Sequence, residues 1–216
     1  MTNTGKAAEI KSFVQWFASH PHPHKVMIAG NHDITLDEPF YARKWSRFHS
    51  ERCNHLSQED SAHGFVPPPT SARTLFYGNN LGIIALENSG TSIRGLNVWG
   101  SPFSPEFCSW SHSVERGAAA AALWQQIPSG THVLLTHGPP VGYGDAVNER
   151  RTGDVSAATF QPCSPAKGFI YLGHCCFARV LFVCNMFLHV DLLREVSTRV
   201  KPLLHLFGHI HEGYGW

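Results

Sequence analysis

Residues 26–33 read Val26-Met27-Ile28-Ala29-Gly30-Asn31-His32-Asp33, an apolar run that ends at a glycine and is followed by three polar side chains. The four apolar residues predict a short strand that is buried on both faces, as in a parallel sheet. Ligands of open α/β sheets bind beyond the carboxyl ends of the strands, so Asn31 and His32 lie where a site is expected. Taken alone, the polar run is equally compatible with a solvated turn.

Two later stretches repeat this pattern of an apolar strand that ends in polar residues. Residues 131–136 run into His137-Gly138-Pro139-Pro140, and residues 203–207 run into Gly208-His209-Ile210-His211. We expect the three strand ends to lie together at one edge of one sheet. Neutral imidazoles and a carboxamide oxygen are ligands for borderline divalent ions, and alternate positions such as His209 and His211 can reach two neighbouring ions.

The remaining sequence pattern outlines an α/β fold. Apolar spacing and composition predict helices over residues 6–18, 36–50 and 114–127. Strand-like runs over residues 74–77 and 83–86 flank Gly78-Asn79-Asn80, which predicts a hairpin or tight connection, and residues 93–99 predict a further strand. The segment His20-Pro21-His22-Pro23-His24 must break the first helix. We interpret it as a polar connector, with adventitious metal binding as the alternative.

Length, charge and cysteine usage limit the class of protein. A chain of 216 residues suits one domain with a sizeable core. Seventeen basic and sixteen acidic residues, with no run of five like charges, argue against a nucleic-acid surface, so we expect a small partner. Six cysteines without paired CxxC spacing, in a sequence that starts without an apolar leader, predict free thiols and a cytoplasmic location.

The three polar strand ends resemble the later motifs of the calcineurin-like metallophosphoesterases, in the same order and at similar separation. The flanking residues, including Gly208 to Gly215, are more narrowly similar to the metallophosphoesterase domain-containing proteins of that superfamily. The resemblance implies an α/β fold in which a β-sandwich of mixed sheets is flanked by helices. It also implies hydrolysis of small phosphodiesters or nucleotides, including cyclic nucleotides.

The resemblance further implies a centre of two divalent ions, which can be Mn, Fe, Zn or Ni, that share a bridging hydroxide. The implied ligands are Asn31, His137 and His209 for the second ion and His211 for the first. His32 would contact the phosphate or protonate the leaving oxygen, a role that suits a group titrating near neutrality. Asp33 would orient His32, as carboxylates do around metal-site histidines.

The chain departs from the family pattern at both ends. The family begins with an Asp-x-His strand end and a Gly-Asp strand end, and the aspartate of the latter bridges the two ions. Here Glu9 is the only acidic residue before Asn31. We therefore expect residues 1–216 to form a single incomplete domain that starts just after these motifs and has weak or no turnover. The chain also stops at Trp216, where the family continues into further strands.

Residues 155–188 form a third departure, which we interpret as a non-homologous insert rich in Phe, Leu, Val and Cys. Our hypothesis is a translated intron, because Val155-Ser156 can be encoded by a donor-like sequence and the apolar run by a pyrimidine-rich tract. Two alternatives for this insert are disfavoured. A membrane span over residues 169–190 would be interrupted by polar residues. A zinc knuckle from His174, Cys175, Cys176 and Cys184 would lack the CxxC spacing of structural zinc sites.

A second functional class stays open on the sequence alone. The chain could be a non-catalytic module that keeps the pocket and binds a nucleotide or a protein. Serine-nucleophile hydrolysis and P-loop chemistry are disfavoured, because the sequence contains neither GxSxG nor GxxxxGK[ST].

Overall fold

The computed structural model describes residues 1–49, 69–78, 81–143, 145, 169–171 and 189–210. Its helices are α1 (Ala7–Ala18), α2 (Glu38–His49), α3 (Pro69–Tyr77), α4 (Ala118–Gln125) and α5 (Val190–Glu195), with short helical segments η1 (Ile34–Leu36) and η3 (Val196–Val200). Its strands are β1 (Lys25–Ile28), β2 (Ile83–Leu86), β3 (Ser89–Ile93), β4 (Leu96–Ser101), β5 (Ser104–Pro105), β6 (Ser113–Val114), β7 (Val133–Thr136), β8 (Phe169–Tyr171) and β9 (Leu204–Phe207). The predicted α/β class is confirmed.

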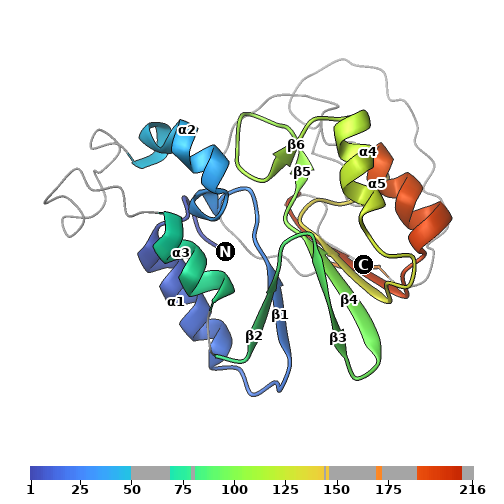
Figure 1. The fold of residues 1–216 in the computed structure, drawn as a ribbon, viewed down its shortest axis with the longest axis horizontal. Coiled ribbons are helices and arrows are strands. Elements are labelled where there is room, and N and C mark those ends of the chain that lie inside the picture. Colours follow the sequence, from blue (N-terminus) through green and yellow to red (C-terminus); the bar gives the residue numbers. More distant parts are fainter. Residues whose placement is uncertain (50–68, 79–80, 144, 146–168, 172–188, 211–216) are drawn as a thin grey trace, which may run out of the picture.

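Two main sheets with helices on their outer faces build the fold, beside a short parallel pair of β5 and β6 (Figure 1). The smaller sheet pairs β1 with β2 in parallel, and the larger has the order β3-β4-β7-β9-β8. Only β3 and β4 are antiparallel within the larger sheet, so it is mixed. A Cβ at Gly100 of β4 would lie 2.6 Å from Leu86 Cβ of β2, which shows how closely β4 approaches the smaller sheet. This arrangement agrees with the mixed-sheet sandwich that the sequence resemblance implies.

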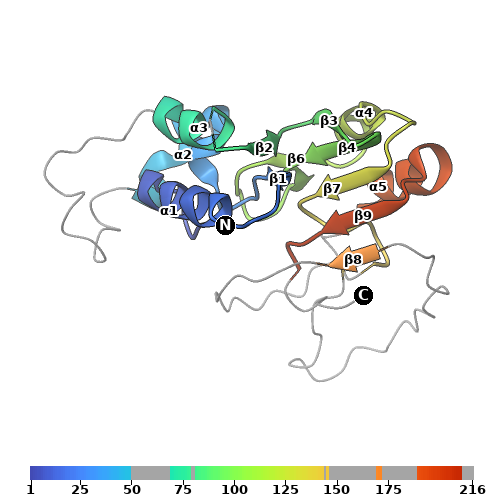
Figure 2. The same ribbon diagram turned by 90° about the horizontal axis from the view of Figure 1, so that it is seen from below.

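Each sheet has its own apolar core beneath its helices. Ile10 and Val14 of α1 pack with Met27 of β1 and Phe76 of α3, which covers the smaller sheet. On the other side of the molecule, α4 and α5 lie against the larger sheet (Figure 2), where Leu134 of β7 joins an apolar cluster. The remaining buried members of this second cluster are Ala120, Trp124, Ile127, Leu192, Val196 and Val200. Each of the two sheets is therefore held by a close-packed core of its own.

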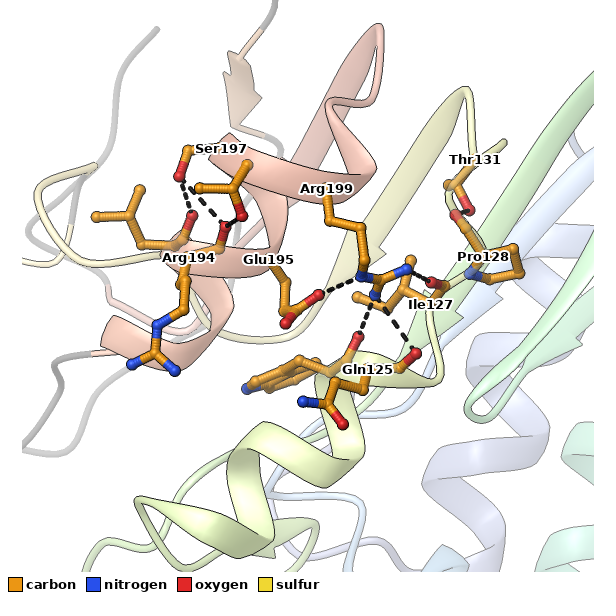
Figure 3. A network of polar contacts seen from close by, with 11 residues as sticks. Gln125, Ile127, Pro128, Thr131, Arg194, Glu195, Ser197 and Arg199 are labelled. Atoms are coloured by element: carbon orange, nitrogen blue, oxygen red, sulfur yellow. Dashed lines mark hydrogen bonds and ion pairs between the residues drawn. The ribbon is translucent and has the colours of Figure 1, made fainter.

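Arg199 joins η3 to the end of α4 (Figure 3). Its guanidinium donates to the carbonyl oxygens of Ile127, at 2.7 Å, and Trp124, at 3.1 Å, and it forms an ion pair with Glu195. The last carbonyls of a helix have no partner within the helix, so this side chain supplies a C-terminal cap. The contact fixes α4 against the segment that leads into β9.

One strand prediction is wrong, and another is only partly right. Residues 74–77 belong to α3, and β2 pairs in parallel with β1, so no hairpin forms at Gly78. The physical reason is that Ala72 and Phe76, four residues apart on one helix face, are both buried. The hairpin lies instead within the predicted strand over residues 93–99, where Arg94 and Gly95 both have positive φ and connect β3 to β4.

The expected insert lies mostly outside the described residues. Only β8 within residues 155–188 is described, and it pairs in parallel with β9 at the edge of the larger sheet. The zinc-knuckle residues and the proposed splice boundary fall outside the described part, so the domain limits and the insert stay predictions. None of the described helices combines the length and apolar character that crossing a membrane requires.

Candidate metal centre

Three strand ends bring Asn31, His137 and His209 together. Asn31 follows β1, His137 follows β7, and His209 follows β9. The Oδ1 of Asn31 lies 2.8 Å from Nε2 of His137, and Nδ1 of His209 lies 3.0 Å from the same Nε2. One part of the expectation is wrong, because β1 belongs to the smaller sheet whereas β7 and β9 are neighbours in the larger. The cluster therefore forms between two sheets.

Backbone hydrogen bonds fix the two histidine loops to each other. The N–H of His137 donates to the carbonyl of Ser101 at 3.1 Å, and the N–H of Gly208 donates to the carbonyl of His137 at 2.9 Å. A Cβ at Gly30 would lie 2.7 Å from Cε1 of His137, so a glycine is required where the end of β1 meets this imidazole. The relative positions of the ligand loops are thus set by the backbone.

A separate set of contacts holds the loop that carries Asn31. The Ser111 hydroxyl donates to the Asn31 carbonyl at 2.7 Å, and the His112 N–H donates to Oδ2 of Asp37 at 2.8 Å. From the other side, the Thr2 hydroxyl donates to Oδ1 of Asp33 at 2.6 Å. The Asn31 loop is therefore clamped between residues near the amino terminus and the segment before β6.

Burial keeps the imidazole of His137 neutral. Desolvation, and next the neighbouring charge of His209, hold the pKa of His137 well below the ordinary 6.5. An imidazole that stays neutral at physiological pH keeps a lone pair for a metal ion. The electrostatics of the cluster therefore favour the protonation state that metal binding needs.

The donor atoms fit one divalent ion. Asn31 Oδ1 has no proton to give, and the single proton of His137 can lie on Nδ1, which leaves lone pairs on all three clustered atoms. Two ligand atoms at about 2.1 Å from an ion and at right angles to each other are roughly 3 Å apart. The separations of 2.8 and 3.0 Å match this value. An oxygen and two imidazole nitrogens suit borderline ions.

His32 and Asp33 lie beside this cluster but are not joined to each other by the hydrogen bonds of the described residues. Nδ1 of His32 lies 2.9 Å from the carbonyl of Asn3, and its ring centroid lies 4.2 Å from that of Trp110. The buried carboxylate of Asp33 accepts from Thr2 and, at 2.8 Å, from the N–H of Gly30. These contacts give Asp33 a role in shaping the loop, and its predicted role in orienting His32 stays a prediction.

The first ion of the predicted pair, to which the resemblance assigns His211, has no described ligand set. His211 lies outside the described residues, and the described part contains no group of three or more His, Cys, Asp or Glu placed to hold an ion. The Asn31-His137-His209 cluster is not such a group, because it contains two histidines and its third donor is an asparagine amide. The structure thus brings together three of the four predicted ligands.

Sequence reasoning missed several residues that support the centre. Trp110 and Ser111 contact the Asn31-His32 loop, while the buried Thr136 hydroxyl contacts His205 at 2.8 Å. His189 is also buried, and a Cβ at Gly138 would lie 2.5 Å from its Nε2. Each contact joins residues that are distant in the sequence, so no local motif marks them.

Comparison with known proteins points to the same family as the sequence motifs. Over 220 residues the chain is 32% identical to the human metallophosphoesterase domain-containing protein 1, a match that covers 99% of the chain. The chain is thus similar to a metallophosphoesterase over nearly its whole length. It is also 29% identical over 215 residues to a UPF0046 protein of Caenorhabditis elegans, again across 99% of the chain. No family model matches the chain.

The chain spans about half the length of the curated relatives it matches, namely 52% of the human protein and 44% of the nematode protein. Metallophosphoesterases generally use divalent metal ions, and the fit of the Asn31-His137-His209 cluster to one such ion agrees with this similarity.

Proposed function

We propose that this chain carries a metal-dependent phosphoesterase site that acts on small phosphodiesters. One observation carries the proposal: three lone-pair donors from three strand ends meet within 3.0 Å of their neighbours, at positions that match the family motifs. Asn31, His137 and His209 would hold one divalent ion, and we assign His211 to a second. Cyclic nucleotides are the finer hypothesis for the substrate, and the cysteine usage supports a cytoplasmic location.

The bound ion would supply Lewis-acid polarisation of a phosphoryl oxygen and a bound water of lowered pKa. The chain itself positions His32. When Nδ1 carries a proton it can donate to the Asn3 carbonyl, 2.9 Å away, so Nε2 is the nitrogen that exchanges a proton with the leaving oxygen. Contact with Trp110 restricts rotation of the ring. These contacts support the assignment of His32 as the acid.

We propose weak or no turnover for residues 1–216. No aspartate precedes Asp33, so this sequence offers no counterpart to the Asp-x-His and Gly-Asp motifs. Without the bridging carboxylate, the second ion would lose affinity and the attacking hydroxide would be harder to form.

Hydrolysis of bis(4-nitrophenyl) phosphate with Mn²⁺ tests this proposal. We expect slow hydrolysis that a chelator stops, that His137→Ala abolishes, and that His22→Ala, a change at an exposed histidine, leaves intact. Hydrolysis that resists the chelator or His137→Ala would contradict the assigned site. Robust turnover lost in His137→Ala would support the site and contradict the proposed weak activity.

A non-catalytic nucleotide-binding module is the second candidate function. The observation that favours it is the neutral donor set of Asn31, His137 and His209, which includes no carboxylate among the described residues. Complete absence of hydrolysis, together with nucleotide binding that survives a chelator, would establish this candidate in place of the first.

A further inference from the structure

We propose that Thr136 and His205 are positioning residues that hold His137 at the metal centre, an inference that rests on the proposed function. Thr136 is the last residue of β7, and His205 lies on the adjacent strand β9. Both side chains are about 1% exposed. Their contacts lie directly behind the loop that carries His137.

The Thr136 hydroxyl sits between two partners. Its Oγ1 lies 2.8 Å from the carbonyl oxygen of Gly138 and 2.8 Å from Nε2 of His205. A hydroxyl has one proton to donate, and a carbonyl oxygen can only accept. The proton therefore goes to Gly138, and His205 must donate its own Nε2 proton to Thr136.

Burial of His205 supports this direction. Desolvation lowers the pKa of His205 to about 3, so the imidazole carries a single proton at physiological pH. Placing that proton on Nε2 completes a chain in which His205 donates to Thr136 and Thr136 donates to Gly138. Hydrogen bonds in a buried, low-dielectric environment are stronger than in water, so this chain restrains the Gly138 carbonyl.

This hydrogen-bond chain adds to the contacts that hold the backbone on both sides of His137. The His137 N–H is bound to Ser101 and its carbonyl accepts from Gly208, while the next carbonyl, that of Gly138, accepts from Thr136. Gly138 also cannot move toward His189, because the space of a Cβ there is already occupied by Nε2 at 2.5 Å. The peptide units flanking the imidazole are thus restrained on both sides, and its Nε2 lies within 3.0 Å of Asn31 Oδ1 and His209 Nδ1.

Residues behind a metal ligand act by limiting its motion, and their loss weakens metal binding by about 10- to 100-fold in known sites. A purely structural pair would instead change stability and leave metal affinity unaltered. His205 does not act as a ligand in this account, because its Nε2 is engaged by Thr136.

The test compares Mn²⁺ affinity by calorimetry in four chains: wild type, Thr136→Val, Thr136→Ser and Thr131→Val. Thr131 is a matched control, since its buried hydroxyl also bonds a carbonyl, that of Pro128 at 2.8 Å, before the opposite end of β7. We expect Thr136→Val to weaken binding by about 10- to 100-fold, and Thr136→Ser and Thr131→Val to stay near wild type. Wild-type affinity in Thr136→Val would overturn the proposal.

Long-range ¹H–¹⁵N spectra of the wild-type protein give a readout that does not depend on metal or on a variant. We expect the proton of His205 on Nε2, and a proton on Nδ1 would overturn the hydrogen-bond chain even if Thr136→Val fails to fold. A wild-type chain that binds no Mn²⁺ overturns the proposed function and this role together. Wild-type binding that Thr136→Val leaves unchanged overturns this role alone.

Discussion

The amide oxygen of Asn31 lies 2.8 Å from Nε2 of His137, although the two residues follow strands of different sheets. The candidate centre is therefore a product of the sandwich. Neither sheet alone contains the donor set, and each packs over its own core. Substitutions that change the distance between the sheets should affect metal binding more than they affect the secondary structure.

Gly30→Ala should weaken Mn²⁺ binding. Its new Cβ would lie 2.7 Å from Cε1 of His137, so the imidazole must move away from Asn31. Gly130→Ala is the control, because a Cβ there meets only Nδ2 of Asn97 at 3.8 Å. Calorimetric titration checks the prediction, and equal affinities in the two variants would show that the close approach of Gly30 is unimportant.

Ser111→Ala should weaken both the fold and the centre. It removes the hydroxyl that donates to the Asn31 carbonyl, so we expect a loss of about 1 kcal/mol in the free energy of unfolding and weaker Mn²⁺ binding. Urea denaturation and calorimetry measure the two effects. The exposed Ser92→Ala on β3 should change neither quantity, and a Ser111→Ala protein that also changes neither would refute the clamp.

Arg199→Met should reduce the free energy of unfolding by about 1–3 kcal/mol, because the last carbonyls of α4 lose a charged donor. Arg194→Met provides the comparison within the same segment. The Arg194 side chain is 60% exposed and its ion pair with Asp191 spans 3.3 Å, so its loss should cost less than about 1 kcal/mol. Similar losses in the two variants would argue against the cap.

Acid should destabilise the fold through buried histidines. Desolvation lowers the pKa of His205 to about 3 and that of His189 well below the ordinary 6.5, which applies in the unfolded chain. The unfolded state therefore binds more protons below about pH 6.5, so stability decreases as the pH is lowered below this value, by up to roughly 1.4 kcal/mol per pH unit for each histidine. For His205 this decrease continues to about pH 3. Stability above pH 6.5 should not depend on these groups.

The matched variants for this pH dependence are His205→Gln and the exposed His24→Gln. In urea unfolding measured between pH 4 and pH 7, His205→Gln should show a shallower pH dependence than wild type, and His24→Gln the same dependence as wild type. Unchanged slopes in both variants would mean that His205 is not kept neutral by burial.

Much of the centre could be predicted from sequence because its ligands follow apolar strands. Buried parallel strands are mostly apolar runs, so the sequence predicts β1, β7 and β9. The polar residues that follow these runs include Asn31, His137 and His209. The helices α1, α2 and α4 were also predictable, because apolar spacing or an Ala-rich run marks them.

The rest depends on contacts that no local pattern records. Short apolar runs do not indicate which strands pair, so the sequence alone does not place β1 in a separate sheet from β7 and β9. Residues 74–77 have strand-like side chains, but tertiary packing places them in α3. The supports of the ligands join distant residues, such as Ser111 with Asn31 and His205 with Thr136. Their side chains look ordinary until the fold brings them together.

The most direct test of the metal centre is the stoichiometry and affinity of Mn²⁺ for the wild type, Asn31→Ala, His137→Ala and His209→Ala. We predict that the described cluster binds one Mn²⁺ ion and that each of the three substitutions lowers its affinity at least about 10-fold. The exposed His22→Ala should leave the affinity unchanged. Wild-type Mn²⁺ affinity in His137→Ala would contradict the account.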